Sequence, residues 1–113
     1  MTMLCSEVLQ ALGGKTLVTA ESLTGGGIGN ALTAVSGSSA VYKGGIISYT
    51  NEVKHRILGV PQEVLDTCGA VSEPTARAMA EGVRRVLDAD VSAPDSFIAF
   101  PALSAGRFPW SVF

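Results

Sequence analysis

Charged residues are scarce in this sequence. Asp, Glu, Lys and Arg make up 16% of the 113 residues, whereas a typical soluble domain has about 25%. The 8 basic and 10 acidic residues give a net charge of −2 and form no basic cluster. We therefore expect neither nucleic acid nor a membrane surface as a partner. The low charge content predicts a surface that is small relative to the core or partly covered by another chain.

Cysteine and long hydrophobic runs are also lacking. Cys5 and Cys68 are too few for a disulfide framework or a zinc cage. No metal-binding motif is present, so we expect neither a metal nor a cofactor. No apolar run approaches about 18 residues, so we expect no transmembrane helix. The first apolar stretch contains Glu7 and lacks a basic start, unlike a signal peptide. Together these absences predict a cytoplasmic protein.

The residues that are present follow an α/β pattern in a chain long enough for one domain. Helical spacing of apolar residues extends over 3–12, and a short β-prone run covers 15–20. A glycine-rich turn at 25–27 then leads into a second helical stretch, 28–35. Strand, glycine turn and helix in this order are typical of an α/β unit.

The second half continues the alternation. A buried strand is predicted from Ile46 to Tyr49, followed by a helix over 52–58 with Asn51 as its cap. Residues 61–69 form a short helix or loop, and Ser72 starts the clearest helix, whose apolar residues repeat at helical spacing. A strand is expected from Asp90, but the segment 93–95 breaks it, so only 97–100 has a sheet-like pattern. The last fourteen residues show no period.

Two places in this pattern could carry chemistry, because ligands of open α/β sheets bind beyond the carboxyl ends of strands. One is Ser22 with the turn Thr24–Gly27, where glycines and a helix start can hold a phosphate or an oxyanion. The other is the segment from Tyr49 to Lys54. Glycine turns between a strand and a helix are mostly structural, so this turn alone is a weak signal of function.

Lys54 is the candidate base of this site. A desolvated lysine has a lowered pKa and can activate a serine such as Ser22, although most lysines are solvated surface residues. His55 lies about 100° around the helix from Lys54, so a serine–histidine arrangement is less favoured. Glu21 is either an acceptor near the site or part of the turn. Cys68 has no cationic neighbour, which favours a structural role.

Five segments resemble a known family in sequence and order: TAESLTGG (19–26), VSGSSAVYKGG (35–45), YTNEVK (49–54), LGV (58–60) and GAVSE (69–73). The chain resembles the CinA C-terminal-domain family, whose characterised members are nicotinamide mononucleotide deamidases. The family usually has a cysteine after its serine, and here Leu23 stands in that position.

The resemblance implies a three-layer α/β/α fold with a mainly parallel sheet and an amidohydrolase of a small nucleotide that needs no metal. The catalytic residues it implies are Ser22, Lys54 and Tyr49. Tyr49 would relay a proton or hold the lysine, and N–H groups of Thr24–Gly26 would stabilise the oxyanion. The Gly37–Ser39 loop is a candidate for the phosphate. The expected substrate-binding residues are Glu21, Thr24, Gly25, Gly26, Ser38, Ser39 and Asn51.

The resemblance runs from about residue 4 to Val91, which divides the chain into a family-like part, 1–91, and a divergent apolar tail, 92–113. The family's TGIAGP loop, its last strands and its C-terminal helix have no counterpart that can be assigned. An exposed sheet edge and the apolar tail predict a homo-oligomer. Two hypotheses follow from the sequence. The chain is an amidohydrolase, complete or impaired, or it is a non-catalytic nucleotide-binding or interaction module that keeps the fold.

Overall fold

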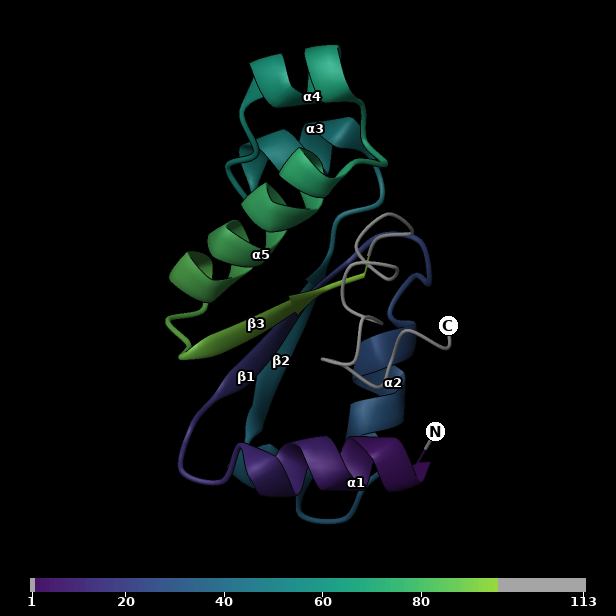
Figure 1. The fold of residues 1–113 in the computed structure, drawn as a ribbon, viewed down its shortest axis with the longest axis vertical. Helices are drawn as coiled ribbons and strands as arrows, with labels where there is room; N and C mark the ends of the chain where they lie inside the picture. The colour runs from purple at the N-terminus through teal and green to yellow at the C-terminus, as the bar shows by residue number, and fades with distance from the viewer. Residues whose placement is uncertain (1, 96–113) are drawn as a thin grey trace.

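A parallel three-stranded sheet forms the centre of the molecule. The computed structural model describes residues 2–95, and the strands β1 (Leu17–Glu21), β2 (Tyr42–Ile47) and β3 (Val91–Pro94) lie in the order β2-β1-β3 (Figure 1). Both neighbours pair with β1 in parallel. Because β1 is central, all five of its residues are buried. The predicted mainly parallel sheet is confirmed.

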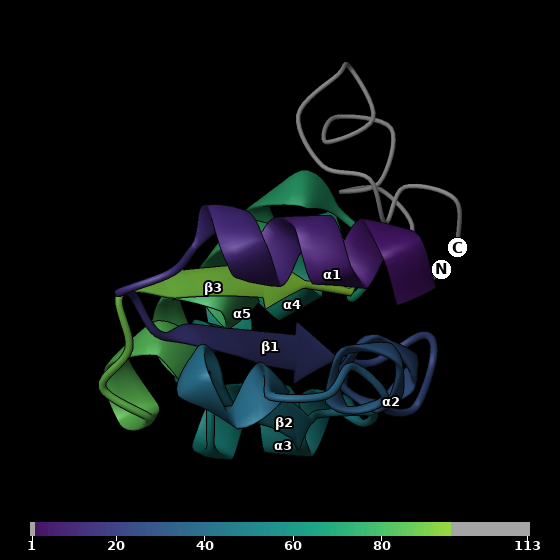
Figure 2. The same ribbon diagram turned by 90° about the horizontal axis from the view of Figure 1, so that it is seen from below.

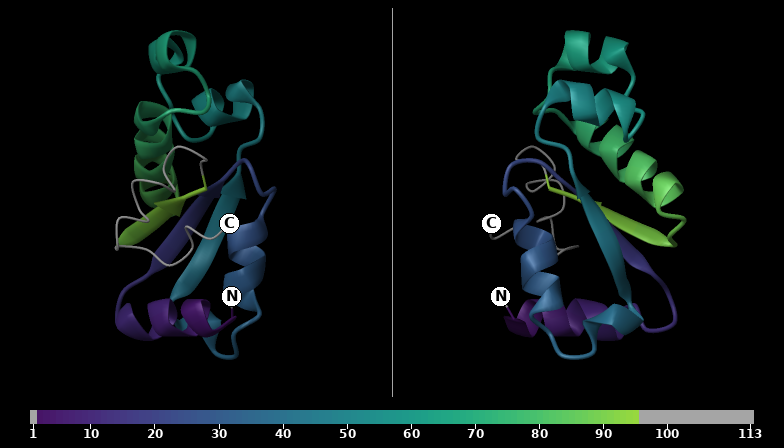
Figure 3. Two further views of the ribbon diagram at one scale, coloured as in Figure 1. Left: turned by 45° about the vertical axis from the view of Figure 1, so that its right-hand side comes forward. Right: turned by 180° about the vertical axis from the view of Figure 1, so that it is seen from behind.

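Helices cover both faces of this sheet. They are α1 (Thr2–Ala11), α2 (Gly27–Thr33), α3 (Asn51–Arg56), α4 (Gln62–Cys68) and α5 (Glu73–Val86), and a short 3-10 helix, η1, spans Ser38–Ala40. The two views of Figure 3 place α2 and α5 on opposite sides of the strands. Side chains alternate along β1, so Leu17 packs with α1 and α2, whereas Val18 packs against α5. The three layers are therefore α/β/α.

The first helix lies beside the amino ends of β1 and β2, as Figures 1 and 2 show. Its residues Cys5 and Leu9 join Leu17 in one buried cluster. The opposite cluster is built on Met79 and Val83 of α5. In the described residues, no helix has the length and apolar character needed to cross a membrane.

The second strand differs from its predicted position. It begins at Tyr42 rather than Ile46, and its residues are alternately half-buried and exposed because it lies at one edge of the sheet. The two glycines before Ile46 belong to the strand and not to a preceding loop. A Cβ atom at Gly45 would overlap the hydroxyl of Thr19 on β1. Glycine is therefore needed here for close approach of the strands.

The third strand also corrects a prediction, since proline does not break it. Val91 donates its N–H to Thr16 O and Asp95 donates its N–H to Ala20 O, at 3.0 and 2.8 Å. Only every second residue of β3 directs its N–H towards β1. Pro94, which has no N–H, occupies a position whose N–H would face away from β1. The expected strand at 97–100 lies outside the described residues.

Helix starts in the second half follow their capping residues. The Ser72 hydroxyl accepts the N–H of Thr75 at 3.3 Å and starts α5, as predicted. At α3 the cap is Thr50, whose hydroxyl accepts the N–H of Val53 at 3.3 Å, and Asn51 is the first helical residue. The predicted cap is thus displaced by one residue, because threonine has the extended backbone that a cap requires.

Candidate functional site

A crevice is located at the carboxyl ends of β1 and β2. The chain leaves β1 towards α2 on one face of the sheet and leaves β2 towards α3, α4 and α5, of which α5 covers the other face. Divergent connections from neighbouring parallel strands separate the chain there and leave room for a ligand. The segments that begin at Ser22 and at Ser48 therefore meet at one site, as the sequence predicts.

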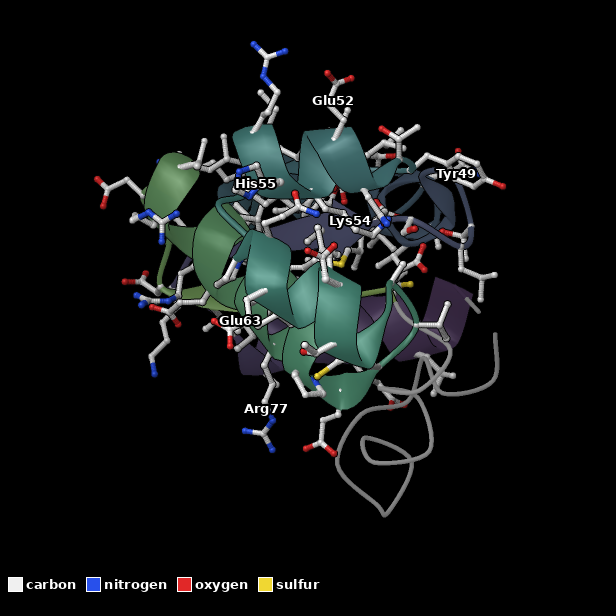
Figure 4. The ribbon with its side chains drawn as sticks, turned by 90° about the horizontal axis from the view of Figure 1, so that it is seen from above. Tyr49, Glu52, Lys54, His55, Glu63 and Arg77 are labelled. Carbon is white, nitrogen blue, oxygen red and sulfur yellow. The ribbon has the colours of Figure 1, made fainter. Side chains whose placement is uncertain are left out.

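Lys54 is the buried residue of the short helix α3. Its side chain is 1% exposed and points inward between α3 and α4 (Figure 4). The Nζ atom donates to Ser22 Oγ at 2.9 Å, to Ser48 O at 2.6 Å and to Tyr49 O at 3.0 Å. All three directions around the nitrogen are thus occupied. The predicted contact between the serine and the lysine is present.

The surroundings of Lys54 act on the pKa of its amine in opposite directions. Burial lowers the pKa of this amine below the ordinary lysine value, and the negative charge of Asp95 acts in the opposite direction. A neutral amine has two N–H groups and one lone pair. In the neutral form, the carbonyls of Ser48 and Tyr49 take the two N–H groups, so the lone pair is directed at the hydroxyl of Ser22. In the ammonium form, the same contact is a donation from Nζ to Ser22 Oγ.

The main chain on either side of Ser22 is fixed by hydrogen bonds. The carbonyl of Glu21 accepts the N–H of Ser48 at 2.6 Å and its hydroxyl at 3.2 Å. On the other side, the N–H of Leu23 donates to Asp95 Oδ1 at 3.0 Å. The carbonyl of Ser22 itself accepts the N–H of Gly25 at 3.3 Å. The hydroxyl of Ser22 therefore projects from a rigid segment.

A cavity of about 310 Å³ opens in front of this pair, within the size range of small-molecule sites. Tyr49 is 73% exposed and its ring extends outward at the rim (Figure 4). In the structure, it is the carbonyl of Tyr49, and not its hydroxyl, that holds the lysine. The cavity is lined by Ser22, Leu23, Tyr49, Lys54, Ala70, Val71, Met79 and Asp95.

The glycine turn differs from the predicted oxyanion site. The N–H of Thr24 donates to Asp95 Oδ2 at 2.9 Å, and that of Gly25 is used by the carbonyl of Ser22. Two of the three expected donors are therefore already occupied within the protein. Gly25 and Gly26 have φ angles of 64° and 109°, a left-handed conformation that glycine adopts at little cost. Their structural role is to reverse the chain before α2.

Glu21 lies beneath the start of α2 and faces away from the lysine. Its carboxylate accepts the N–H groups of Ile28 at 2.7 Å and Gly29 at 3.0 Å, and the hydroxyls of Thr19 and Thr24. This buried carboxylate occupies the anion-binding position of the helix start. The carboxylate therefore takes the position that a phosphate would occupy at this helix start. Glu21 stabilises the turn that follows Ser22.

Two other predicted residues, Ser38 and Ser39, lie away from the pair, and a third is exposed. Ser38 and Ser39 belong to η1, which immediately precedes β2 and lies at the amino end of the sheet, because Val41 O accepts the N–H of Leu17. The site is at the carboxyl end, about five residues of strand away, so this loop does not contribute to it. Asn51 is exposed at the start of α3.

The remaining side chains that sequence reasoning considered have other surroundings. The ring of His55 lies 2.8 Å from Val60 O through Nδ1, and Cys68 is an exposed free thiol. Within residues 2–95, no group of His, Cys, Asp and Glu has the arrangement of a metal site.

Asp95 is the site residue that sequence reasoning missed. Its side chain is fully buried, and its carboxylate accepts the N–H groups of Leu23 and Thr24 and the hydroxyl of Thr24. The sequence predicts a strand break at 93–95, which includes Asp95. An acidic residue directly after a parallel strand was the available signal, because that position faces the same crevice as Ser22.

Known proteins match this chain over most of its length. The family model of the CinA C-terminal domain matches residues 2–105. The match therefore extends beyond Val91, where the sequence motifs predict that the resemblance ends. A CinA-like protein of Synechococcus sp. (strain CC9902) is 54% identical over 100 residues, which cover 87% of this chain and 24% of that protein. A putative competence-damage inducible protein of Bacillus mycoides (strain KBAB4) is 50% identical over 100 residues, which cover 88% of this chain and 24% of that protein.

Solved structures give the same assignment. The competence damage-inducible protein A of Klebsiella pneumoniae has a TM-score of 0.80 at 36% identity, covering 82% of this chain and 59% of the other. A CinA superfamily protein of Enterobacter cloacae has a TM-score of 0.80 at 38% identity, and the match covers 82% of this chain and 56% of that protein. This chain thus spans about a quarter of the curated relatives' length and more than half of these solved chains. It belongs to the CinA C-terminal domain family.

Proposed function

We propose that this CinA-family chain is an amidohydrolase that converts nicotinamide mononucleotide to nicotinate mononucleotide and ammonia. Ser22 is the nucleophile and Lys54 its base. Tyr49 holds the lysine through its carbonyl and lies at the rim of the cavity, where its ring is available to the substrate. The choice of nicotinamide mononucleotide as substrate rests on the resemblance of the motifs TAESLTGG and YTNEVK to the family. The reaction type rests on the geometry of the site.

One observation carries the reaction type. The 2.9 Å hydrogen bond between Lys54 Nζ and Ser22 Oγ is made by a buried amine whose other two positions face carbonyl oxygens. Carbonyls accept hydrogen bonds but never donate them, so a neutral lysine has only the serine proton to accept. A serine activated in this way attacks carbonyl carbon atoms.

The steps balance with these two side chains alone. Lys54 takes the proton of Ser22 as Oγ bonds to the carboxamide carbon, and the resulting ammonium gives that proton to the leaving nitrogen as the C–N bond breaks. Ammonia departs and an acyl ester remains on Ser22. Water then attacks the ester, Lys54 accepts a proton from the water, and the proton returns to Ser22 Oγ as the nicotinate leaves. The Gly26 N–H stays a proposed donor to the oxyanion.

Ammonia release from nicotinamide mononucleotide tests this function. Ser22→Ala removes the hydroxyl, so we expect at least about a thousandfold loss of kcat. Ser6→Ala, a change at an exposed serine of α1, is the matched control and should keep the parent rate. Circular dichroism of each variant checks that the fold is retained.

Two outcomes would contradict the proposal. Full activity in Ser22→Ala excludes this serine as the nucleophile. A parent chain that releases no ammonia, yet binds the nucleotide in calorimetry, is instead the non-catalytic module that the sequence left open.

A further inference from the structure

We propose that Asp95 is a positioning residue for the Ser22–Lys54 pair: it ties the segment after Ser22 to the end of β3 and places a carboxylate beside the cavity that holds the amine. This inference rests on the proposed function for its kinetic consequence. Its structural content stands on the hydrogen bonds of one buried side chain.

Asp95 holds the serine segment from two directions. Its own N–H donates to Ala20 O at 2.8 Å, two residues before Ser22. Its carboxylate accepts the N–H of Leu23 at 3.0 Å and that of Thr24 at 2.9 Å, directly after Ser22. Asp95 thus forms hydrogen bonds with the main chain on both sides of the nucleophile. A carboxylate that binds consecutive N–H groups fixes their orientation strongly.

The neighbouring strand completes this arrangement. Ser48, just after β2, binds Glu21 O with both its N–H and its hydroxyl, while its own carbonyl accepts from Lys54. The lysine is therefore anchored to the end of β2 and the serine to the end of β3. The 2.9 Å contact between Nζ and Oγ depends on both anchors, because β1 lies between these two strands.

The carboxylate of Asp95 is also the acidic group that acts on Lys54 through charge. Its negative charge raises the pKa that burial lowers. The other charged or titratable groups near α3 are directed elsewhere: Glu52, His55 and Arg56 lie on its exposed faces, and Tyr49 extends outward. Glu21 faces the start of α2. From α5 the cavity receives the uncharged Met79, and from the segment before it Ala70 and Val71.

The replacement Asp95→Asn separates positioning from mere folding. The amide keeps the shape but loses the charge, and it presents N–H groups where an acceptor is needed. We expect kcat to fall at least about tenfold while KM stays within about twofold, because the serine is displaced and the nucleotide contacts remain. Asp66→Asn, at an exposed aspartate of α4, is the matched control and should change neither value.

A titration of Lys54 gives a readout that does not depend on deamidation. The chain has three lysines, so the ¹³Cε signal of Lys54 in lysine-labelled protein is assigned by its loss in Lys54→Met. In Asp95→Asn this signal should titrate at lower pH than in the parent, because the opposing negative charge is gone. An unmoved or upward titration overturns the proposal.

Amide hydrogen exchange of the parent covers the case in which Asp95→Asn does not fold. Leu23 and Thr24 lie outside helices and strands, yet their N–H groups should exchange as slowly as those of β1. Exchange at the rate of an open loop refutes the positioning role. A parent without deamidase activity refutes the proposed function. The ¹³Cε titration and the amide exchange can still test the role of Asp95.

Discussion

At the scale of single residues, the buried Lys54 decides what the site can do. An ammonium group buried without a carboxylate in hydrogen-bond contact is destabilised relative to water, and main-chain carbonyls and the charge of Asp95 compensate only part of that loss. The lowered pKa of Lys54 reflects this balance. The same burial that destabilises the charged lysine therefore makes it a base, so stability and reactivity are linked at one atom.

The pH dependence of ammonia release follows from this lowered pKa. The proposed base acts when neutral, so kcat/KM should rise with pH and level off below the ordinary lysine pKa of about 10.4. Lys54→Arg should not restore activity, because guanidinium stays protonated and cannot accept the serine proton. A pH series of the parent and this variant tests both statements. A parent profile that keeps rising beyond the ordinary lysine pKa would exclude Lys54 as the base.

The stability of the fold should carry the same signature. Because the pKa of Lys54 is lower in the folded chain than in the unfolded chain, the unfolded chain binds more protons between these two values. The free energy of unfolding contributed by this group rises with pH across that window, and it is lost as the pH falls through the folded pKa. In Lys54→Met this contribution is absent. Urea unfolding at several alkaline pH values, compared between parent and variant, measures the difference.

At the scale of elements, sequence reasoning located the site through strand ends and family motifs. Ser22 and Lys54 each follow a strand of the parallel sheet, and they meet as predicted. Ser38 and Ser39 were misplaced because their loop lies at the amino end of β2. Asp95 was missed because a proline such as Pro94 usually indicates the end of a strand. It does not do so at the edge of a sheet, where its nitrogen faces away from β1. Pairing between distant strands supplies that information, and a local pattern does not.

The close approach of α5 to the segment between α3 and α4 offers an element-scale test. A Cβ at Gly82 would overlap the main-chain carbonyl of Leu58. Gly82→Ala should therefore destabilise the fold by about 1–3 kcal/mol, although alanine is the better helix former by about 1 kcal/mol. Urea unfolding measures the change. Glu81→Ala, at an exposed position of the same helix, should stay within about 0.5 kcal/mol, and a stabilised Gly82→Ala would refute the close packing.

At the scale of the whole molecule, the described part of the chain has few charges and an open sheet edge. The outer side of β2 faces no other strand among residues 2–95, and Ile47 at its end is 54% exposed. Exposed edges of this kind pair readily with other chains. These features support the expectation from composition that another copy covers part of the surface.

We accordingly propose that the chain forms a homo-oligomer through the β2 edge. Light scattering should give a mass of at least twice the chain mass of 11.6 kDa. Ile47→Lys places a charge on that edge and should lower the measured mass, because a lysine there must be desolvated on pairing. Val86→Lys makes the same exchange at an exposed apolar residue of α5 and should leave the mass unchanged. A parent that stays monomeric at millimolar concentration would refute the assembly, and an unchanged mass in Ile47→Lys would exclude the β2 edge as its interface.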